Sequence, residues 1–214
     1  MTPLTVCETF YSIQGESTFA GYPCFFIRLT GCNLRCSYCD TAYAYEEGEI
    51  LEEAELVERA IRCGARLVEV TGGEPLLQNG TVPLLKSLSG SGFTVLLETN
   101  GSQPLGAVPE DVVRIMDLKC PSSGMSGFMD LNNLNYLGMK DQVKFVIQNQ
   151  ADYEWTRDII GEYQVFERTQ IMLSPVWGRM DAGLLAEWML ADRLPARLQI
   201  QLHKFIWPDR ERMA

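Results

Sequence analysis

The sequence contains no long apolar run, no basic leader segment and little positive charge. No stretch approaches the roughly 18 apolar residues that cross a bilayer, and the N-terminal MTPLTVCETF has neither a basic patch nor the apolar core of a signal peptide. We therefore expect a cytoplasmic protein with no membrane partner. The net charge of −10 argues against nucleic-acid binding, which depends on clustered Lys and Arg. A small molecule is the expected partner.

The cysteines do not form the pattern of a disulfide framework. Seven is an odd number, and a reducing compartment keeps thiols free. Cys7, Cys24, Cys63 and Cys120 are scattered, as expected of structural thiols that pack like small apolar residues. The other three crowd into eight residues and need a separate explanation.

The chain of 214 residues is long enough for one α/β domain with a sizeable core, and we expect a single domain over residues 1–214. Apolar, β-branched runs alternate with amphipathic stretches, which predicts a parallel sheet built with right-handed helical crossovers. The expected strands lie at 24–30, 66–71, 93–99, 112–119, 142–147, 170–173 and 197–205. The expected helices lie at 51–63, 82–88, 152–163 and 181–191.

Five polar or glycine-containing segments each follow one of these strands. They are GCNLRCSYCDT, TGGEP, ETNG, KCPSSG and SPVWG. Because open parallel sheets bind ligands at the carboxyl ends of their strands, we expect all five segments at one mouth.

The three crowded cysteines are Cys32, Cys36 and Cys39, in the spacing C-x3-C-x2-C. Three thiolates on one short loop can bind three irons of a single [4Fe-4S] cubane and leave the fourth iron open to another ligand. The alternative is a zinc site completed by a distant residue such as His203, the only histidine. Zinc sites favour paired C-x2-C knuckles, so the spacing favours the cluster.

With an aromatic residue, Tyr38, before the last cysteine, this spacing resembles the defining motif of the radical S-adenosylmethionine (SAM) superfamily. The resemblance implies that the open iron chelates the amino and carboxylate groups of SAM. It also implies reductive cleavage of SAM to a 5′-deoxyadenosyl radical that abstracts a substrate hydrogen. The implied fold is an incomplete (β/α)6 relative of the TIM barrel, closed by loops at the cluster end.

Further SAM contacts follow from the same resemblance. TGGEP is similar to the segment whose backbone and acidic side chain receive the SAM ammonium group, and its glycines allow close approach to a ligand. An ordinary strand-to-helix turn is the alternative. The full implied set is Tyr38, Cys39, Asp40, Gly73, Glu74, Cys120, Pro121, Ser122, Ser174, Pro175, Val176 and Trp177.

IQGES at 13–17, Arg28 and CDT at 39–41 together resemble the 7-carboxy-7-deazaguanine synthase family. The TGGEP, ETNG and QLHKFI segments extend the likeness over almost the whole chain. Members contract the ring of 6-carboxy-5,6,7,8-tetrahydropterin with loss of ammonia, on the route to bases such as queuosine. The resemblance implies a magnesium contact at Thr41 and substrate contacts at Ile13, Gln14, Gly15, Glu16, Arg28, Thr71 and His203. The roles of Glu98 and Lys144 stay open.

A homodimer and an electron donor such as flavodoxin or ferredoxin are also implied. Some relatives end in a short tail that reaches the substrate, but this chain continues through WPDRERMA, so no terminal contact is carried over. Two other functions compete with this prediction. A glycyl-radical-enzyme activase would need a groove for a peptide loop, and a non-catalytic Fe-S or zinc module would need no SAM.

Overall fold

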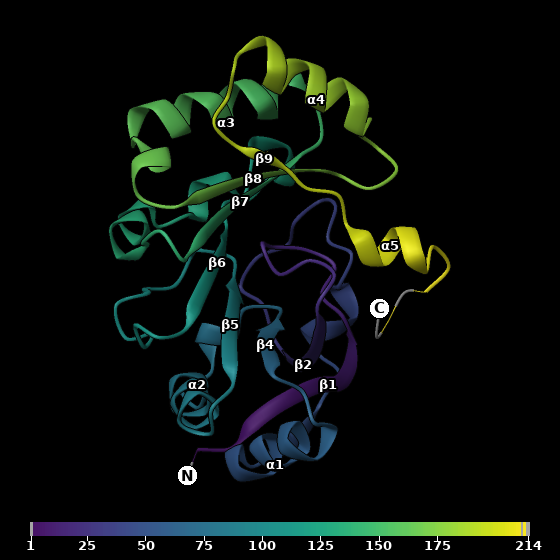
Figure 1. Ribbon diagram of the computed structural model, residues 1–214, viewed down its shortest axis with the longest axis vertical. Coiled ribbons are helices and arrows are strands. Elements are labelled where there is room, and N and C mark those ends of the chain that lie inside the picture. The colour runs from purple at the N-terminus through teal and green to yellow at the C-terminus, as the bar shows by residue number, and fades with distance from the viewer. Residues whose placement is uncertain (1, 211, 213–214) are drawn as a thin grey trace.

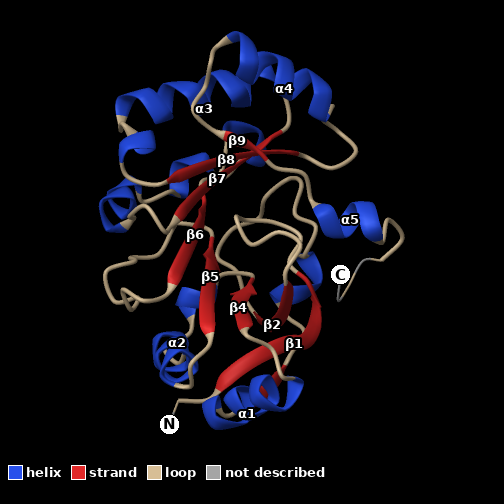
Figure 2. Ribbon diagram, viewed as in Figure 1, coloured by secondary structure: helices blue, strands red, loops and turns tan. Residues whose placement is uncertain are grey.

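The computed structural model describes residues 2–210 and 212, and its central element is one nine-stranded sheet (Figures 1 and 2). The strand order is β3-β1-β2-β4-β5-β6-β7-β8-β9. The strands are β1 (Leu4–Ile13), β2 (Pro23–Leu29), β3 (Glu49–Leu51), β4 (Leu67–Gly72), β5 (Thr94–Thr99), β6 (Val113–Asp117), β7 (Gln142–Ile147), β8 (Gln170–Pro175) and β9 (Arg197–Leu198). Strands β2 and β4 to β9 pair in parallel, whereas β1 pairs antiparallel with both β2 and β3.

Helices follow most of the parallel strands. They are α1 (Glu53–Cys63), α2 (Thr81–Gly90), α3 (Gln150–Glu162), α4 (Ala182–Ala191) and α5 (Leu202–Ile206). Short 3-10 helices lie at Ala42–Tyr45, Pro75–Leu77, Pro121–Ser123, Ser126–Phe128, Leu131–Tyr136 and Val165–Glu167. Within the described ranges, no helix is both long and apolar enough to cross a membrane. The sheet stays open, since β3 and β9 lie at opposite edges, and the predicted incomplete barrel is confirmed.

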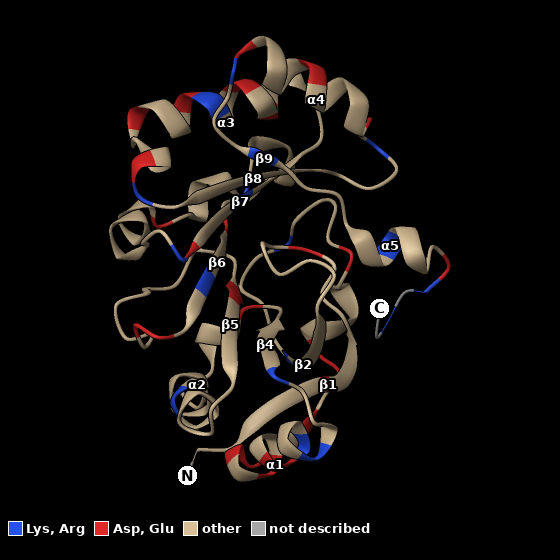
Figure 3. Cartoon of the chain, in the orientation of Figure 1, with Lys and Arg blue, Asp and Glu red and all other residues tan. Residues whose placement is uncertain are grey.

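The two faces of the sheet differ because successive side chains of a strand point to opposite sides. On the outer face, α1 to α4 cover the strands (Figure 1), and charged residues lie along α1 and α3 (Figure 3). The larger core packs against these helices and includes Ile27, Val70, Leu97 and Phe145, all fully buried. The inner face carries a smaller apolar cluster.

Each central strand changes from apolar to charged along its inner face. Four parallel strands each place at least one apolar side chain in the inner cluster. A charged side chain follows the last of these by two residues in the same strand, so it points to the same face, nearer the carboxyl end. The charged side chains are Arg28 on β2, Glu69 on β4, Glu98 on β5 and Asp117 on β6. The inner face therefore has an apolar floor with a polar site above it.

Three expectations about the elements were wrong. β1 and β3 were not predicted, and IQGES, expected ahead of the first strand, begins on the last residue of β1, Ile13. The strand expected at 197–205 is only β9, and the chain then turns into α5, which carries His203. The strand ends because Gln199 turns inward, where its Oε1 accepts a hydrogen bond from the amide of Ser17 at 2.7 Å.

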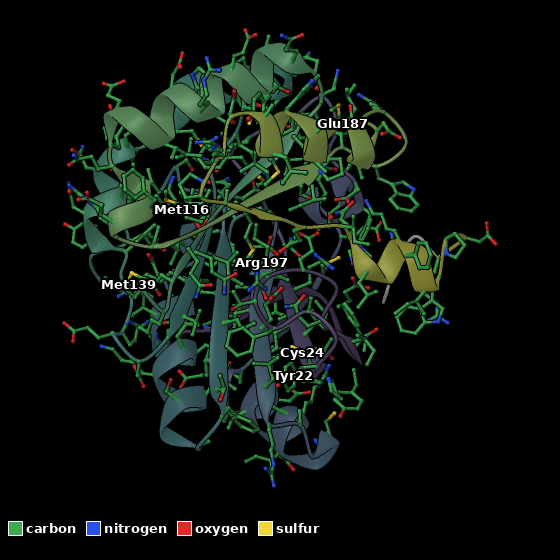
Figure 4. All side chains as sticks on the ribbon, turned by 45° about the horizontal axis from the view of Figure 1, so that its top comes forward. Tyr22, Cys24, Met116, Met139, Glu187 and Arg197 are labelled. Carbon is green, nitrogen blue, oxygen red and sulfur yellow. The ribbon has the colours of Figure 1, made fainter. Side chains whose placement is uncertain are left out.

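The loop of residues 14–18, here called the bridging loop, spans the two sides of the open sheet. It leaves β1 near one edge and reaches β7, where Gln142 Nε2 donates to Thr18 Oγ1 at 2.7 Å. It also meets the chain after β9, where the amide of Leu202 donates to Gly15 O at 2.9 Å. Figure 4 labels Cys24 on β2 and Arg197 at the start of β9, which mark the two sides. The loop therefore connects β1 with β7 and with the chain after β9 across the open sheet.

Candidate active site

A cavity of about 430 Å³ lies at the carboxyl ends of the parallel strands. It collects most of the residues that the sequence singles out for a cluster, a cofactor or a substrate. These are Gln14, Gly15, Glu16, Arg28, Cys32, Cys36, Tyr38, Cys39, Asp40, Thr41, Thr71, Gly73, Val176, Trp177 and His203. Glu98 and Lys144, whose roles were left open, line it too. The expectation of one common mouth is confirmed.

Seven residues of the expected set do not line this cavity: Ile13, Glu74, Cys120, Pro121, Ser122, Ser174 and Pro175. Cys120 is fully buried, and its thiol lies 3.5 Å from Thr156 Oγ1. Ser122 braces the cysteine loop, because its carbonyl accepts a hydrogen bond from Ser37 Oγ at 2.7 Å. Ser122 therefore supports the cysteine loop from outside the cavity.

The three cysteines lie on the loop that follows β2, and all three are free thiols. Gly31 starts this loop at φ +96°, a left-handed conformation that glycine adopts without strain. Cys32 Sγ receives only long contacts, from the amide of Leu34 at 3.4 Å and from Asn100 Nδ2 at 3.7 Å. Within the described ranges, no three His, Cys, Asp or Glu side chains converge on one point as the ligands of a single metal ion would. The three thiolates of a cubane need no such point, because each binds a different iron.

The TGGEP segment packs directly against the cysteine loop. A Cβ on Gly73 would lie 2.1 Å from the Gly31 carbonyl oxygen and 2.7 Å from Cys32 Cβ, so only glycine permits this approach. The Glu74 side chain instead turns into the protein and is fully buried. Its carboxylate accepts hydrogen bonds from the amides of Leu76 and Asn100, at 2.9 and 2.6 Å, and from Thr99 Oγ1. Glu74 thus ties the ends of β4 and β5 together.

Lys144 on β7 is the centre of a buried charge network. Its Nζ lies 2.7 Å from Glu16 Oε2, 2.5 Å from Glu98 Oε1 and 3.4 Å from Asp117 Oδ2. Burial alone would lower the pKa of Lys144, but these three carboxylates raise it well above its usual value. Lys144 is therefore charged, and it holds the bridging loop against the floor of the cavity.

Asp117 has one carboxylate oxygen in use and one without a partner. Oδ2 pairs with Lys119 at 2.7 Å and with Lys144, while Oδ1 is buried and accepts no hydrogen bond among the described residues. Burial would raise the pKa of Asp117, but the two lysines lower it. An ionised acceptor without a donor, in the wall of a cavity, suits a ligand that carries N–H or O–H groups.

Arg28 presents a guanidinium to the cavity from β2. Its Nε donates to Glu8 Oε1 at 2.8 Å, and Tyr43 donates its hydroxyl to the same oxygen at 2.9 Å. Within the described part of the chain, neither terminal nitrogen of Arg28 donates a hydrogen bond to the protein. Because Arg28 lines the cavity, these terminal N–H groups are available to bind a carboxylate there.

The bridging loop and α5 meet above the cavity. Gly15 lies against His203, because a Cβ there would come within 1.9 Å of His203 Nδ1. Burial lowers the pKa of His203, so the ring is neutral at pH 7. Lys204 pairs with Asp40 on the cysteine loop, and Thr41 Oγ1 donates to Asp40 Oδ1 at 3.0 Å. Burial would raise the pKa of Asp40, but Lys204 lowers it.

Several polar residues of the cavity had no role assigned from the sequence, among them Glu69, Asp117, Lys119, Gln201 and Lys204. Two of them had a signal in the sequence. Glu69 and Asp117 are the single acidic residues of largely apolar strands, a position that is costly unless the side chain serves a site. Gln201 had none, because the expected strand at 197–205 hid its contact with Glu16 Oε1 at 2.8 Å.

Comparisons with known proteins place the chain in a family. The model of the radical SAM superfamily matches residues 26–160. A 7-carboxy-7-deazaguanine synthase of Chlorobaculum tepidum is 47% identical over 97% of this chain and 96% of its own length. A second, from Koribacter versatilis, is 42% identical over 95% of this chain and 97% of its own length.

The fold matches as well. The crystal structure of QueE from Escherichia coli superimposes with a TM-score of 0.78 over 94% of this chain and 95% of that chain, at 24% identity. Streptococcus suis SuiB bound to S-adenosylmethionine shares the fold at a TM-score of 0.56 over 80% of this chain and 48% of that chain. From the cysteine loop, the parallel sheet and these matches, the chain belongs to the radical SAM superfamily and, within it, to the 7-carboxy-7-deazaguanine synthase family.

Proposed function

We propose that this chain converts 6-carboxy-5,6,7,8-tetrahydropterin to 7-carboxy-7-deazaguanine with release of ammonia, as a single radical SAM domain over residues 1–214. Membership of the superfamily brings a [4Fe-4S] cluster and SAM, which when bound supply the abstraction of a hydrogen atom. The observation that carries the proposal is that the cysteine loop, Arg28 and the bridging loop line one cavity.

In this proposal Cys32, Cys36 and Cys39 hold the cluster. Their thiols are free and lie beside the cavity, and the close approach of Gly73 fixes one side of their loop. Gly73, Tyr38, Asp40, Val176 and Trp177 offer backbone and side-chain contacts to SAM. The unpartnered Asp117 Oδ1 adds an acceptor to the same wall.

The substrate is held at the other side of the cavity. Arg28 binds the carboxylate of the pterin through its two terminal N–H groups, since Glu8 fixes the guanidinium through Nε. Gln14, Gly15, Glu16 and His203 offer hydrogen-bonding groups to the ring edge. The Lys144 network keeps Glu16 in place.

Magnesium is proposed at Thr41. The Thr41 hydroxyl faces the cavity beside the ionised Asp40, which Lys204 holds from above. Mg²⁺ usually keeps several waters and shares its shell with the substrate, so one protein hydroxyl is a sufficient contact. The neighbouring carboxylate then orients a bound water instead of filling the shell.

The test is anaerobic incubation of cluster-reconstituted protein with SAM, a reductant, magnesium and the carboxypterin. The deazaguanine acid and one ammonia are the expected products, identified by mass spectrometry and an ammonia assay. Cleavage of SAM without either product would contradict the proposed substrate.

Arg28→Gln and Arg66→Gln form a matched pair for the same assay. Arg66 precedes β4 and is exposed outside the cavity, so its replacement should leave the substrate KM unchanged. We expect Arg28→Gln to raise the KM by about 10- to 100-fold, the loss of a charged hydrogen-bonded pair. An unchanged KM for this variant would remove Arg28 from the substrate site.

The family resemblance supports two further parts of the proposal. The electron donor is a protein such as flavodoxin or ferredoxin, and the chain pairs as a homodimer. Reduction of the cluster by purified flavodoxin and light scattering of the eluted protein test these two points separately. A monomer at assay concentration would reject the dimer without affecting the proposed reaction.

A further inference from the structure

Glu69 lies on the floor of the cavity, and no cation among residues 2–210 and 212 forms an ion pair with its carboxyl group. It sits in the middle of β4, directly between Phe26 of β2 and Leu96 of β5 in the sheet register. Its side chain points to the inner face, above the small apolar cluster, and is 3% exposed. Yet Glu69 is one of the residues that line the cavity, so its side chain borders the space in which the substrate is proposed to bind.

The surroundings of Glu69 contrast with those of the other buried acids. Glu74 accepts hydrogen bonds from three different groups, and Asp117 pairs with two lysines. Glu69 accepts one hydrogen bond, from Gln14 Nε2 to its Oε2, and has no ion pair among the described residues. A buried carboxyl group in this setting is far cheaper to keep in its neutral form.

We propose that Glu69 is a neutral carboxylic acid that donates its O–H to an acceptor atom of the pterin ring, a carbonyl oxygen or an unprotonated ring nitrogen. The inference rests on the proposed function. Its geometry follows from the hydrogen bond to Gln14, which occupies Oε2 and leaves Oε1 to carry the proton toward the cavity. Glu69 is then a residue that selects the substrate, because an ionised carboxylate would repel the same acceptor.

Burial and two neighbouring carboxylates raise the pKa of Glu69, and one lysine opposes them. Burial raises the pKa of Glu69 well above its usual value, and the charges of Glu98 on β5 and Glu16 on the bridging loop raise it further. Lys144 on β7 and the Gln14 amide act against this and do not reverse it. On β2, the nearby Cys24 thiol stays neutral because burial raises its pKa.

The first experiment detects the proton without any substrate. Infrared difference spectra of the reconstituted holoenzyme and its Glu69→Gln variant are recorded between pH 6 and pH 8. We expect a carbonyl stretch of a protonated carboxyl group that the variant lacks, present over the whole range. A carboxylate band in its place would overturn the proposal.

The second experiment measures equilibrium binding of the carboxypterin to the SAM-loaded, unreduced enzyme, where no turnover occurs. Glu69→Gln keeps a neutral side chain with an N–H donor, and we expect a Kd within about threefold of the original. Glu69→Leu keeps the volume but has no donor, and we expect binding to weaken by about tenfold. SAM affinity should be unchanged in both variants.

Two binding results would reject the assignment. Equal weakening of carboxypterin binding in Glu69→Gln and Glu69→Leu would indicate that an ionised carboxylate binds the substrate. Unaltered binding in Glu69→Leu would show that Glu69 makes no contact with the substrate. Failure of the proposed reaction is distinguishable from both. If the unaltered enzyme binds the carboxypterin but forms no deazaguanine after reduction, the reaction is wrong while the role of Glu69 is still decided. If the unaltered enzyme does not bind the carboxypterin, both inferences fail.

Discussion

The cysteine loop and the bridging loop face each other across one cavity and are held in opposite ways. On the cysteine loop, Cys32 Sγ has only long contacts and Cys39 is exposed. On the bridging loop, Glu16 alone contacts Lys144, Gln199 and Gln201. One side presents free ligand atoms, and the other has already paired its charges within the protein.

The difference indicates how the two sides work. A side that must accept iron keeps its thiols available, since each sulfur will form a bond to the incoming group. A side that must orient a small heterocycle gains from groups that are fixed beforehand, because less ordering is left to the moment of binding. Changes on the first side should therefore remove cofactors, and changes on the second should alter stability and substrate affinity.

The largest effect is expected from Cys36→Ala. Two thiolates cannot hold the cubane in place of three, so iron and sulfide content and SAM cleavage should fall to background. Cys63→Ala is the control, since Cys63 ends α1 outside the cavity and its loss should leave both properties intact. Retained SAM cleavage by the Cys36 variant would contradict the assignment of the cluster.

Lys144→Met should cause the next largest effect, on stability. It leaves Glu16 and Glu98 without their shared cation, and removing one partner of a buried ion pair costs about 3 kcal/mol. Urea unfolding of anaerobic protein measures this loss, with the exposed Lys86→Met as the control. A loss as small as that of the control would show that water already solvates the network.

The cysteine loop could be predicted from the sequence, and the contacts of the bridging loop could not. The cluster site depends on spacing within eight residues, so Cys32, Cys36 and Cys39 could be assigned by local pattern alone. The parallel strands and the common mouth followed from periodicity, as at Thr71 and Glu98. These features need no knowledge of which distant segments meet.

The contacts of the bridging loop could not be predicted because they join segments far apart in the chain. Glu16 pairs with Lys144 and with Gln201, and no local pattern encodes either pair. The expected strand at 197–205 followed from apolar residues such as Leu198 and Ile200, which are 36% and 47% exposed in the fold. There, tertiary contacts override the local propensity for a strand.

Gly15→Ala tests whether the bridging loop positions α5. The new Cβ would overlap His203 Nδ1, a side-chain atom that can move away, so we expect displacement of His203 instead of unfolding. Carboxypterin binding should weaken by about tenfold, while overpacking costs roughly 1–3 kcal/mol of stability. Gly127→Ala is the control, since a Cβ there meets nothing within 4 Å. Unchanged binding would separate His203 from the substrate.

The smallest effect is the pH dependence that Glu69 adds to stability. Its pKa is raised in the folded state, so the native protein keeps a proton that the unfolded chain releases above its usual pKa of 4.5. The free energy of unfolding must therefore fall as pH rises from 4.5 toward the folded pKa. Glu69→Gln has no such proton, and the shifts of all other groups common to both proteins cancel in the difference. Between pH 5 and pH 6, the free energy of unfolding of Glu69→Gln, measured with urea, should rise relative to that of the original protein by at most about 1.4 kcal/mol. A difference that stays flat, or that reverses sign, would mean that Glu69 is ionised and that the floor of the cavity supplies a carboxylate.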